Sequence, residues 1–307
     1  MKLAASWGHF SEYCPTPAEA VKFCAGSGFR LLDMSFTTAA FQTGLTDGSW
    51  KAMVKEPAEA ARRLGFSFVQ AHSPVGIDWT DEDAFEKHLE ATKRSIEACG
   101  MLGIPHTVVE ACFQKGAGKE AFFERNRLFY RALFPEMERY GVSVLIENTA
   151  PQHTQGRYYF ITGADMREFI RFVGHPMLHA VWDTGHGNMT MRATGQSQRE
   201  NILALGDELY GLHVHGNNGL QDDHLAPFIG WLDMDDIMPA LLEIRYKGTF
   251  TFEADFTVRL SKAFPGRQDL SEKDELFRRV RDISVKSVSL LYDIGRCILE
   301  EYGCFEM

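Results

Sequence analysis

Short apolar runs and longer amphipathic runs alternate eight times along the 307-residue chain, and no Pro- or Ser-rich linker interrupts them. Apolar runs of strand length predict buried strands, whereas apolar residues spaced by three and four predict helices. The expected strands span residues 3–7, 29–35, 66–72, 107–112, 142–148, 178–184, 209–215 and 249–255. The expected helices span residues 17–27, 49–65, 82–103, 119–140, 163–173, 197–207, 234–246 and 274–302. This alternation is typical of parallel βα units.

Glycines precede or open several of the expected strands, at the point where a helix commonly ends in a left-handed residue. They are Gly28, Gly65, Gly141 and Gly248. Eight βα units close naturally into a (β/α)8 TIM barrel of the α/β class, here a single domain over residues 1–307. An open doubly wound sheet is the competing architecture, but no glycine-rich phosphate loop follows the first strand. Residues 259–270 are the expected irregular segment before the last helix.

Four of the expected strands end in a potential metal ligand. The four are Glu147, Asp183, His213 and Glu253, at intervals of 36, 30 and 40 residues. If the strands are parallel neighbours, their carboxyl ends meet at one mouth of the barrel and these side chains converge. A single such residue has a simple explanation, because a polar side chain commonly marks the point where a strand leaves the core. Four in register favour one divalent ion, Mn²⁺, Mg²⁺, Co²⁺ or Zn²⁺, because buried carboxylates need a partner or a metal.

Other polar residues are expected near the same mouth. We expect four side chains to bind substrate: His72, Glu110, His186 and His215. A candidate second metal site combines His186, Asp222 and His224. A solvated loop explains Asp222 almost equally well. Because His213 and His215 point to the same face of one strand, choosing His213 as the ligand places His215 nearer the solvent.

Loops and aromatic residues complete the expected site. The loop at residues 151–160 follows the Glu147 strand and is expected to close over the substrate, with Arg157 as its only cation. Trp7, Phe36 and Trp79 stand near other strand ends and are candidates for an apolar wall, although packing within the loops is the better explanation of each taken singly.

Composition and missing motifs narrow the partners. The chain has 42 acidic and 32 basic residues, a formal charge of −10 and no basic run, which argues against nucleic acid. No run of 18 apolar residues and no signal-peptide core are visible, so we expect a soluble cytoplasmic protein without a membrane partner. The six scattered cysteines contain no CxxC pair and indicate reduced packing residues. The GxSxG and HExxH motifs are also missing.

The motifs around the four ligands resemble those of the xylose isomerase-like TIM-barrel superfamily, in particular its sugar phosphate isomerase/epimerase family. The motifs are Leu145-Ile-Glu-Asn148, Trp182-Asp-Thr-Gly-His186, Leu212-His-Val-His-Gly-Asn217 and Thr251-Phe-Glu253. The resemblance implies a metal-dependent isomerase or epimerase of a small sugar or hydroxy-ketone, acting through a metal-stabilised enediolate. It also implies Glu147 and Glu253 as acid and base, and His186 as a substrate-binding residue.

Two alternatives stay open beside this interpretation. Ketose 3-epimerases carry an arginine where this chain has Gly219, so the 3-epimerase subtype is not implied. The related apurinic endonuclease family 2 binds three zinc ions, and its ligands resemble His72, Glu147, Asp183, His186, His213, Asp222, His224 and Glu253. That branch has a histidine where Glu110 stands here. A non-catalytic sugar-binding barrel is the other alternative, although such a protein is expected to lose one of the two glutamates. Whether the chain forms a homo-oligomer is also open.

Overall fold

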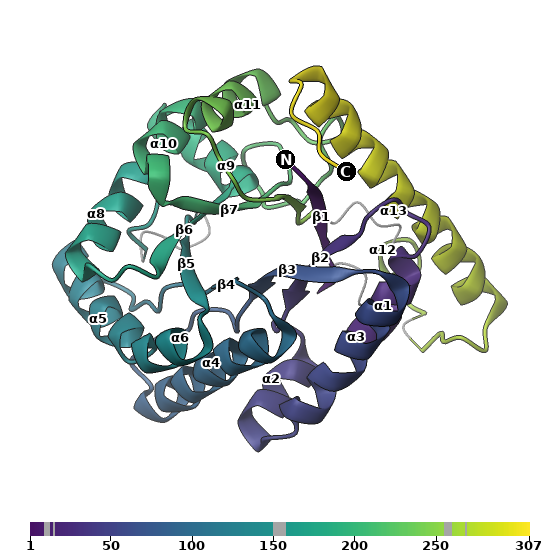
Figure 1. Ribbon diagram of the computed structural model, residues 1–307, viewed down its shortest axis with the longest axis horizontal. Helices are drawn as coiled ribbons and strands as arrows, with labels where there is room; N and C mark the ends of the chain where they lie inside the picture. The colour runs from purple at the N-terminus through teal and green to yellow at the C-terminus, as the bar shows by residue number, and fades with distance from the viewer. Residues whose placement is uncertain (9–12, 15, 150–157, 255–259, 268) are drawn as a thin grey trace.

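Eight parallel strands form one sheet that curls into a barrel inside a ring of helices (Figure 1). The computed structural model describes residues 1–8, 13–14, 16–149, 158–254, 260–267 and 269–307. The strand order is β7-β6-β5-β4-β3-β2-β1-β8. The strands are β1 (Leu3–Ser6), β2 (Leu31–Ser35), β3 (Ser67–His72), β4 (His106–Val108), β5 (Ser143–Glu147), β6 (Leu178–Asp183), β7 (Leu209–His213) and β8 (Phe250–Phe252). The expected single-domain (β/α)8 barrel is confirmed.

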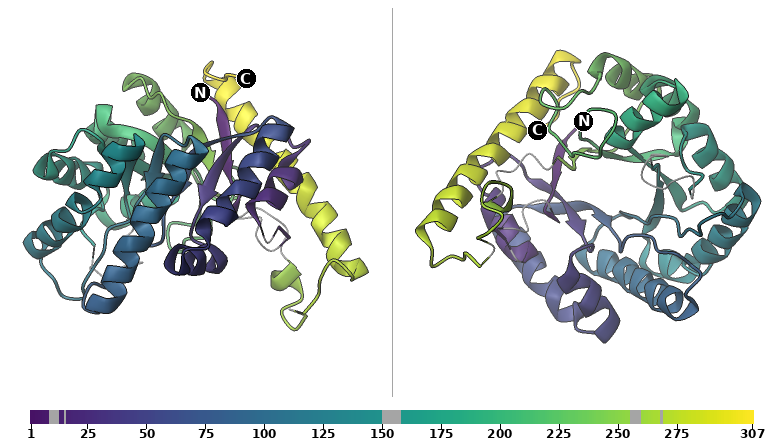
Figure 2. Two further views of the ribbon diagram at one scale, coloured as in Figure 1. Left: turned by 60° about the horizontal axis from the view of Figure 1, so that its bottom comes forward. Right: turned by 180° about the vertical axis from the view of Figure 1, so that it is seen from behind.

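Helices lie outside the strands in both views of Figure 2. They are α1 (Pro17–Cys24), α2 (Ala39–Asp47), α3 (Trp50–Leu64), α4 (Glu82–Leu102), α5 (Lys119–Arg131), α6 (Phe134–Tyr140), α8 (Gly163–Val173), α9 (Thr184–Thr194), α10 (Gln198–Leu205), the 3-10 helix η2 (Gly206–Glu208), α11 (Met234–Glu243), α12 (Leu260–Ala263) and α13 (Glu275–Glu301). The expected helix over 119–140 is two helices, because Pro135 in the first turn of α6 cannot continue α5. Helices α2, α9 and α12 were not predicted.

The barrel closes between β7 and β8 through one short stretch of backbone next to the strand ends. The Val214 N–H donates to the Thr251 carbonyl at 2.8 Å, and the Glu253 N–H donates to the Val214 carbonyl at 3.2 Å. Val214 directly follows the last residue of β7, so this closure holds Glu253 beside the end of that strand. Residue 255, the last of the expected strand over 249–255, lies outside the described residues.

Strand β4 is shorter than predicted, since it ends at Val108 rather than at residue 112. Beyond Val108, side chains of α5 pair with the backbone, and the Tyr130 hydroxyl donates to the Val109 carbonyl at 2.8 Å. Asn126 of α5 is fully buried, accepts the Cys112 N–H at 2.9 Å and donates to the Cys112 carbonyl at 2.9 Å. Glu110 therefore lies in a loop that α5 holds in place.

Left-handed glycines end two of the helices, as expected. Gly65 and Gly141 follow α3 and α6 with φ angles of 72° and 66°. Gly28 also has a positive φ, of 105°. The same expectation for Gly248 is wrong, because its φ is not positive. A side chain at Gly248 would instead collide with the hydroxyl of Tyr246, so close packing explains this glycine.

The two chain ends lie next to each other beside the start of β1, as Figures 1 and 2 show. The Met1 amino group lies 2.9 Å from the Glu306 carboxylate, and the Glu306 N–H donates to the Met1 carbonyl at 2.9 Å.

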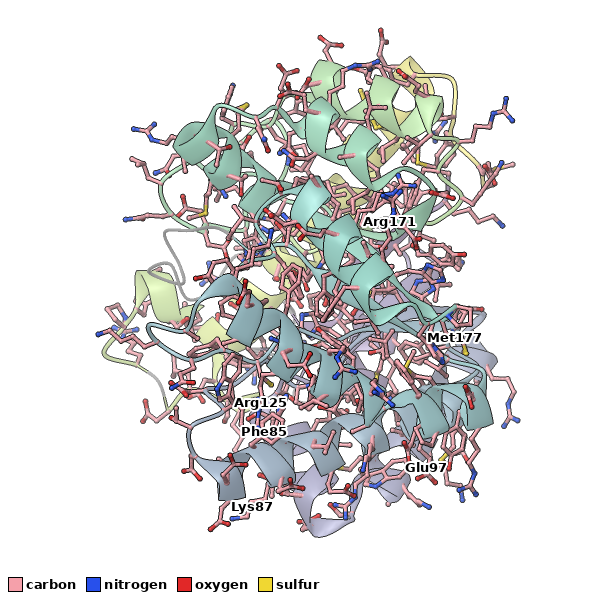
Figure 3. The ribbon with its side chains drawn as sticks, turned by 90° about the vertical axis from the view of Figure 1, so that its left-hand side faces the viewer. Phe85, Lys87, Glu97, Arg125, Arg171 and Met177 are labelled. Atoms are coloured by element: carbon pink, nitrogen blue, oxygen red, sulfur yellow. The ribbon has the colours of Figure 1, made fainter. Side chains whose placement is uncertain are left out.

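Neighbouring helices also contact each other directly, as Figure 3 shows for Arg125 of α5, whose guanidinium lies 4.5 Å from the ring centre of Phe85 in α4. Within the described ranges, no helix has both the length and the apolar character that crossing a bilayer requires.

Replacing Asn126 with Leu should destabilise the fold. The variant leaves the buried N–H and carbonyl of Cys112 unpaired, and we expect the free energy of unfolding to fall by about 2–4 kcal/mol. Urea denaturation measures this change. Arg131→Gln on the exposed end of the same helix is the control, with an expected change within about 0.5 kcal/mol. Equal stability of the two variants would contradict the role given to Asn126.

Candidate metal centre

The four predicted ligands converge at the carboxyl ends of β5, β6, β7 and β8. One ligand atom from each side chain lies within 4.8 Å of the other three. The residues are Glu147, Asp183, His213 and Glu253. Glu147, Asp183 and His213 are the last residues of their strands, and Glu253 directly follows β8. The sequence-based prediction that these strand ends meet is therefore confirmed in its geometry.

Glu147 presents its two carboxylate oxygens to different neighbours. Oε1 lies 2.7 Å from Nδ1 of His213, and Oε2 lies 3.4 Å from Nε2 of His72. Burial alone would raise the pKa of this carboxyl group, but the two imidazoles lower it well below its usual value. In the same way, burial lowers the pKa of His213 while Glu253 and Glu147 raise it, to about 9. The carboxylates at this point thus require a neighbouring positive charge.

Asp183 links β6 to its neighbours through both its side chain and its backbone. Its Oδ1 accepts the backbone N–H of His186 at 2.6 Å, which caps helix α9, and its Oδ2 lies 2.9 Å from Nε2 of His215. Asn148 donates to the Asp183 carbonyl at 3.0 Å and accepts its N–H at 2.7 Å. Burial raises the pKa of Asp183, but His186 and His215 lower it overall. These contacts fix the carboxylate in one orientation.

His213, rather than His215, faces the other three ligands. Its Nδ1 lies 3.6 Å from Oε2 of Glu253 as well as 2.7 Å from Glu147. The expectation that His215 lies nearer the solvent is wrong, because both imidazoles are fully buried. Gly185 explains this burial: a Cβ at that position would overlap the His215 ring, so only glycine leaves the ring its space.

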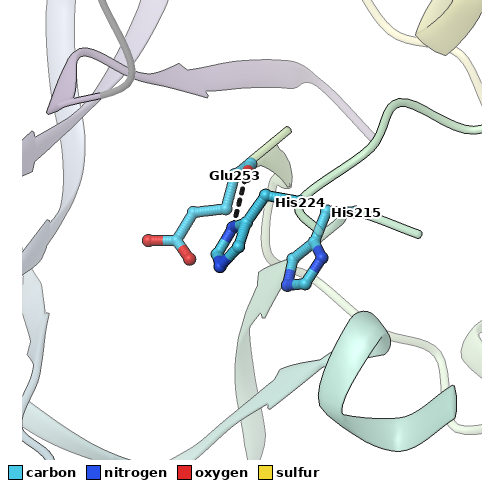
Figure 4. Close-up of side chains that lie close together, drawn as sticks. All are labelled: His215, His224 and Glu253. Carbon is cyan, nitrogen blue, oxygen red and sulfur yellow. Dashed lines mark hydrogen bonds between the residues drawn. The ribbon is translucent and has the colours of Figure 1, made fainter. Parts of the chain in front are cut away.

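A second group of side chains lies beside the first. Figure 4 shows the ring of His224 against that of His215, with a centroid distance of 3.9 Å and an angle of 12°. His224 Nδ1 donates to the Glu253 carbonyl at 2.8 Å. Asp222 Oδ2 lies 2.9 Å from Nε2 of His224 and 3.5 Å from Nε2 of His186. The three residues predicted as a second metal site are therefore neighbours in space.

His72 and Glu110 form a third group with Glu147. The Nε2 atom of His72 lies 3.6 Å from Oε1 of Glu110, and Glu110 Oε2 accepts the Gly76 N–H at 3.3 Å. One ligand atom each from His72, Glu110 and Glu147 lies within 4.8 Å of the others. Burial raises the pKa of Glu110 to about 7, against the opposing effect of His72.

A partly open cavity of about 350 Å³ lies over these groups. Its described lining residues are His72, Val75, Gly76, Glu110, Ala111, Phe113, Glu147, Asn148, Thr149, Tyr158, His186, Asp222, His224 and Glu253. Of the four predicted ligands, the two glutamates reach the cavity, whereas Asp183 and His213 are fully buried behind it. His215 is likewise not among the described lining residues.

The three aromatic residues considered for an apolar wall are not among the described residues that line the cavity. Trp7, Phe36 and Trp79 are buried in the hydrophobic core. Phe113 and Tyr158 line the cavity instead, with ring centres 5.2 Å apart. Most of the loop expected to close over the substrate, including Arg157, lies outside the described residues.

Two polar residues inside the barrel were not predicted. Asp33 of β2 and Gln70 of β3 are fully buried, and Gln70 Nε2 donates to Asp33 Oδ2 at 2.9 Å. Asp33 Oδ2 lies 4.0 Å from Nε2 of His213. A polar residue in the middle of an apolar strand was the available signal, because such a side chain is costly to bury without a partner.

The donor set fits a divalent cation. Carboxylate oxygens with one imidazole nitrogen suit Mn²⁺, Mg²⁺, Co²⁺ or Zn²⁺, and their convergence within 4.8 Å matches ligands that share one ion. Burial of the carboxylates adds to this fit, because a cation would compensate charge that only imidazoles balance in the described residues.

Curated relatives match parts of the chain. Uncharacterized protein y4fM of Sinorhizobium fredii is 24% identical over 205 residues, which cover 64% of this chain and 59% of that protein. A protein named "Probable endonuclease 4" from Citrifermentans bemidjiense is 28% identical over 146 residues, or 45% of this chain and 50% of the relative. The chain thus spans about half to three fifths of the length of these relatives.

Solved structures match almost the whole chain. D-Psicose 3-epimerase from Clostridium cellulolyticum H10 superimposes with a TM-score of 0.72 at 16% identity, covering 97% of this chain and 99% of that one. The IolI protein with a bound zinc atom gives a TM-score of 0.73 at 16% identity and covers 100% of both chains. Such low identity shows a shared fold alone.

A family model described as "Xylose isomerase-like TIM barrel" matches residues 21–263, which is more than half of the sequence. The chain therefore belongs to the xylose isomerase-like TIM barrel family.

Proposed function

We propose that the protein is a divalent-metal-dependent isomerase or epimerase of a small, uncharged sugar or hydroxy-ketone. The observation that carries this proposal is the division among the four converging side chains. Glu147 and Glu253 line the cavity, whereas Asp183 and His213 lie behind it. Two side chains can therefore hold a cation from within the barrel, while the two glutamates both hold it and contact a substrate.

The cation would be held by Glu147, Asp183, His213 and Glu253, and would stabilise the negative oxygen that develops when a proton leaves the adjacent carbon. The protein supplies the proton acceptors. One oxygen of Glu147 lies on the His213 side and the other on the His72 side. A single carboxylate can therefore bind the cation through one oxygen and transfer a proton through the other. Glu253 directly follows β8, whereas Glu147 ends β5. Glu253 would therefore return a proton from a different direction.

Polar groups around the cavity suit a polyhydroxy substrate. His72, Glu110 and His186 all line it and offer hydrogen-bond donors and acceptors for hydroxyl groups. Four carboxylates, from Glu110, Glu147, Asp222 and Glu253, and three imidazoles, from His72, His186 and His224, line the cavity. No Lys or Arg stands among its described lining residues. The lack of these two cationic side chains among the described lining residues supports a neutral substrate over a phosphorylated one. We assign His215 to the support of Asp183, through their 2.9 Å contact.

Glu147→Gln and Glu253→Gln should each stop proton exchange at the substrate carbon. Each change keeps an oxygen that can bind the cation but removes a carboxylate base, and we expect exchange to fall at least about 10²-fold. Deuterium uptake from solvent, screened over ketoses and hydroxy-ketones with Mn²⁺, measures it. Glu138→Gln on the exposed side of α6 is the matched control and should exchange normally. Normal exchange in either site variant would exclude that glutamate as acid or base, whereas no exchange in the wild type would fit a barrel that only binds sugar.

A multi-zinc hydrolase is the second candidate. The observation that favours it is that three groups of potential ligands adjoin one another at the mouth: Glu147, Asp183, His213 and Glu253; His72, Glu110 and Glu147; and His215, His224 and Glu253. The endonuclease-named relative supports it as well. The described lining residues include no Lys or Arg, which weighs against a nucleic-acid substrate because these side chains bind phosphate backbones.

Metal analysis should separate these two functions. We expect one ion per chain after dialysis against metal-free buffer, because only the first group contains four potential ligands. Inductively coupled plasma mass spectrometry of the purified protein gives the ratio. His224→Asn is the informative variant: it should keep one ion under the isomerase proposal. A content of about three zinc ions that falls in this variant would instead favour the hydrolase.

A further inference from the structure

A buried polar group lies inside the barrel beneath the proposed metal ligands. Asp33 of β2, Gln70 of β3 and His213 of β7 are all fully buried. Each leaves one side-chain atom without a hydrogen-bond partner: Oδ1 of Asp33, Oε1 of Gln70 and Nε2 of His213. Buried polar groups in folded proteins are normally paired, so three unpaired atoms in one place call for an explanation.

The three side chains form a row in space, from Gln70 through Asp33 to His213. Gln70 Nε2 donates to Asp33 Oδ2 at 2.9 Å, and this same oxygen lies 4.0 Å from Nε2 of His213. On the opposite side of the imidazole ring, Nδ1 lies 2.7 Å from Oε1 of Glu147. The ring of His213 therefore separates Asp33 from the proposed metal ligands, with one nitrogen directed toward each.

We propose that Asp33, oriented by Gln70, is a positioning residue that accepts a hydrogen bond from Nε2 of His213. A neutral imidazole carries one ring hydrogen, so a hydrogen held on Nε2 leaves the Nδ1 lone pair available for the cation. The 4.0 Å separation exceeds a hydrogen bond by about 1 Å, which a small turn of the Asp33 carboxylate covers. This inference rests on the proposed metal centre.

The surroundings of the pair argue against a role in filling space alone. Nearby inward positions carry apolar side chains, namely Val108, Leu145 and Val181, which form a small cluster of their own. Gly211 lies two residues before His213, and a Cβ there would come within 2.6 Å of Oε1 of Gln70. The barrel thus leaves space for a polar side chain at a level where apolar residues otherwise pack.

The first test is the affinity of the protein for Mn²⁺, measured by electron paramagnetic resonance of the free ion. Asp33→Asn should weaken binding about 10- to 100-fold, because the amide can present an N–H to Nε2 and favour a hydrogen on Nδ1. Gln70→Leu should weaken binding in the same direction, since it removes the donor that orients Asp33.

Thr251→Val is the matched control. Thr251 is fully buried on β8, and its hydroxyl bonds to that of Thr249 at 2.8 Å, not to His213. It should keep the wild-type affinity. Equal affinity in Asp33→Asn and wild type would overturn the proposal. So would an equal loss in Asp33→Asn and Thr251→Val, since that result indicates a general cost of altering buried polar groups.

The second test needs no variant at Asp33 and remains decisive if Asp33→Asn does not fold. Long-range ¹H–¹⁵N spectra of the zinc-loaded wild type report which imidazole nitrogen carries hydrogen, with His213 assigned by its loss in His213→Asn. We expect the hydrogen on Nε2, and a hydrogen on Nδ1 would overturn the proposal. If the wild type binds no metal, the proposed metal centre itself fails. If it binds metal and Asp33→Asn binds equally well, only the role of Asp33 fails.

Discussion

The burial of several carboxylates at one end of the barrel is the constraint on which the site depends. Glu147, Asp183 and Glu253 come from different strands, yet their oxygens lie within 4.8 Å of one another and of His213. Like charges at such distances repel strongly when water is excluded, so the arrangement persists only with positive charge among them. Imidazoles supply that charge in the protein alone, and a divalent ion is the natural replacement because these oxygen and nitrogen donors suit it.

Backbone connections at the barrel mouth hold this arrangement in place. The closure between β7 and β8 through Val214 sets Glu253 beside His213, and Asn148 ties the end of β5 to that of β6. These links lie directly beside the strand ends rather than far out on loops, which favours accurate placement of reacting groups. They also determine which carboxylates reach the cavity, and this difference in depth underlies the separate roles proposed for the glutamates and for Asp183.

Most of the architecture was predictable because alternating apolar runs reflect local burial. The failures occurred where a single side chain determined where an element begins or ends. Helix α9 covers a glycine-containing segment with weak helix propensity, and it forms where Asp183 caps its first turn. Beyond the end of strand β4, Tyr130 and Asn126, from a helix further along the chain, take up backbone groups of Val109 and Cys112.

The sequence alone determined the strand-end positions of Glu147, Asp183, His213 and Glu253, because polar residues that close apolar runs are visible without any tertiary contact. Only the tertiary structure decided which residues support them. Asp33 and Gln70 approach His213 across the barrel. His215 is buried because Gly185, in the helix that follows β6, has no side chain to occupy the space of the ring. Such contacts join segments distant in the chain at particular depths in the barrel. Strand periodicity reveals the inward face of each strand, whereas depth depends on strand register, which spacing along the chain does not specify.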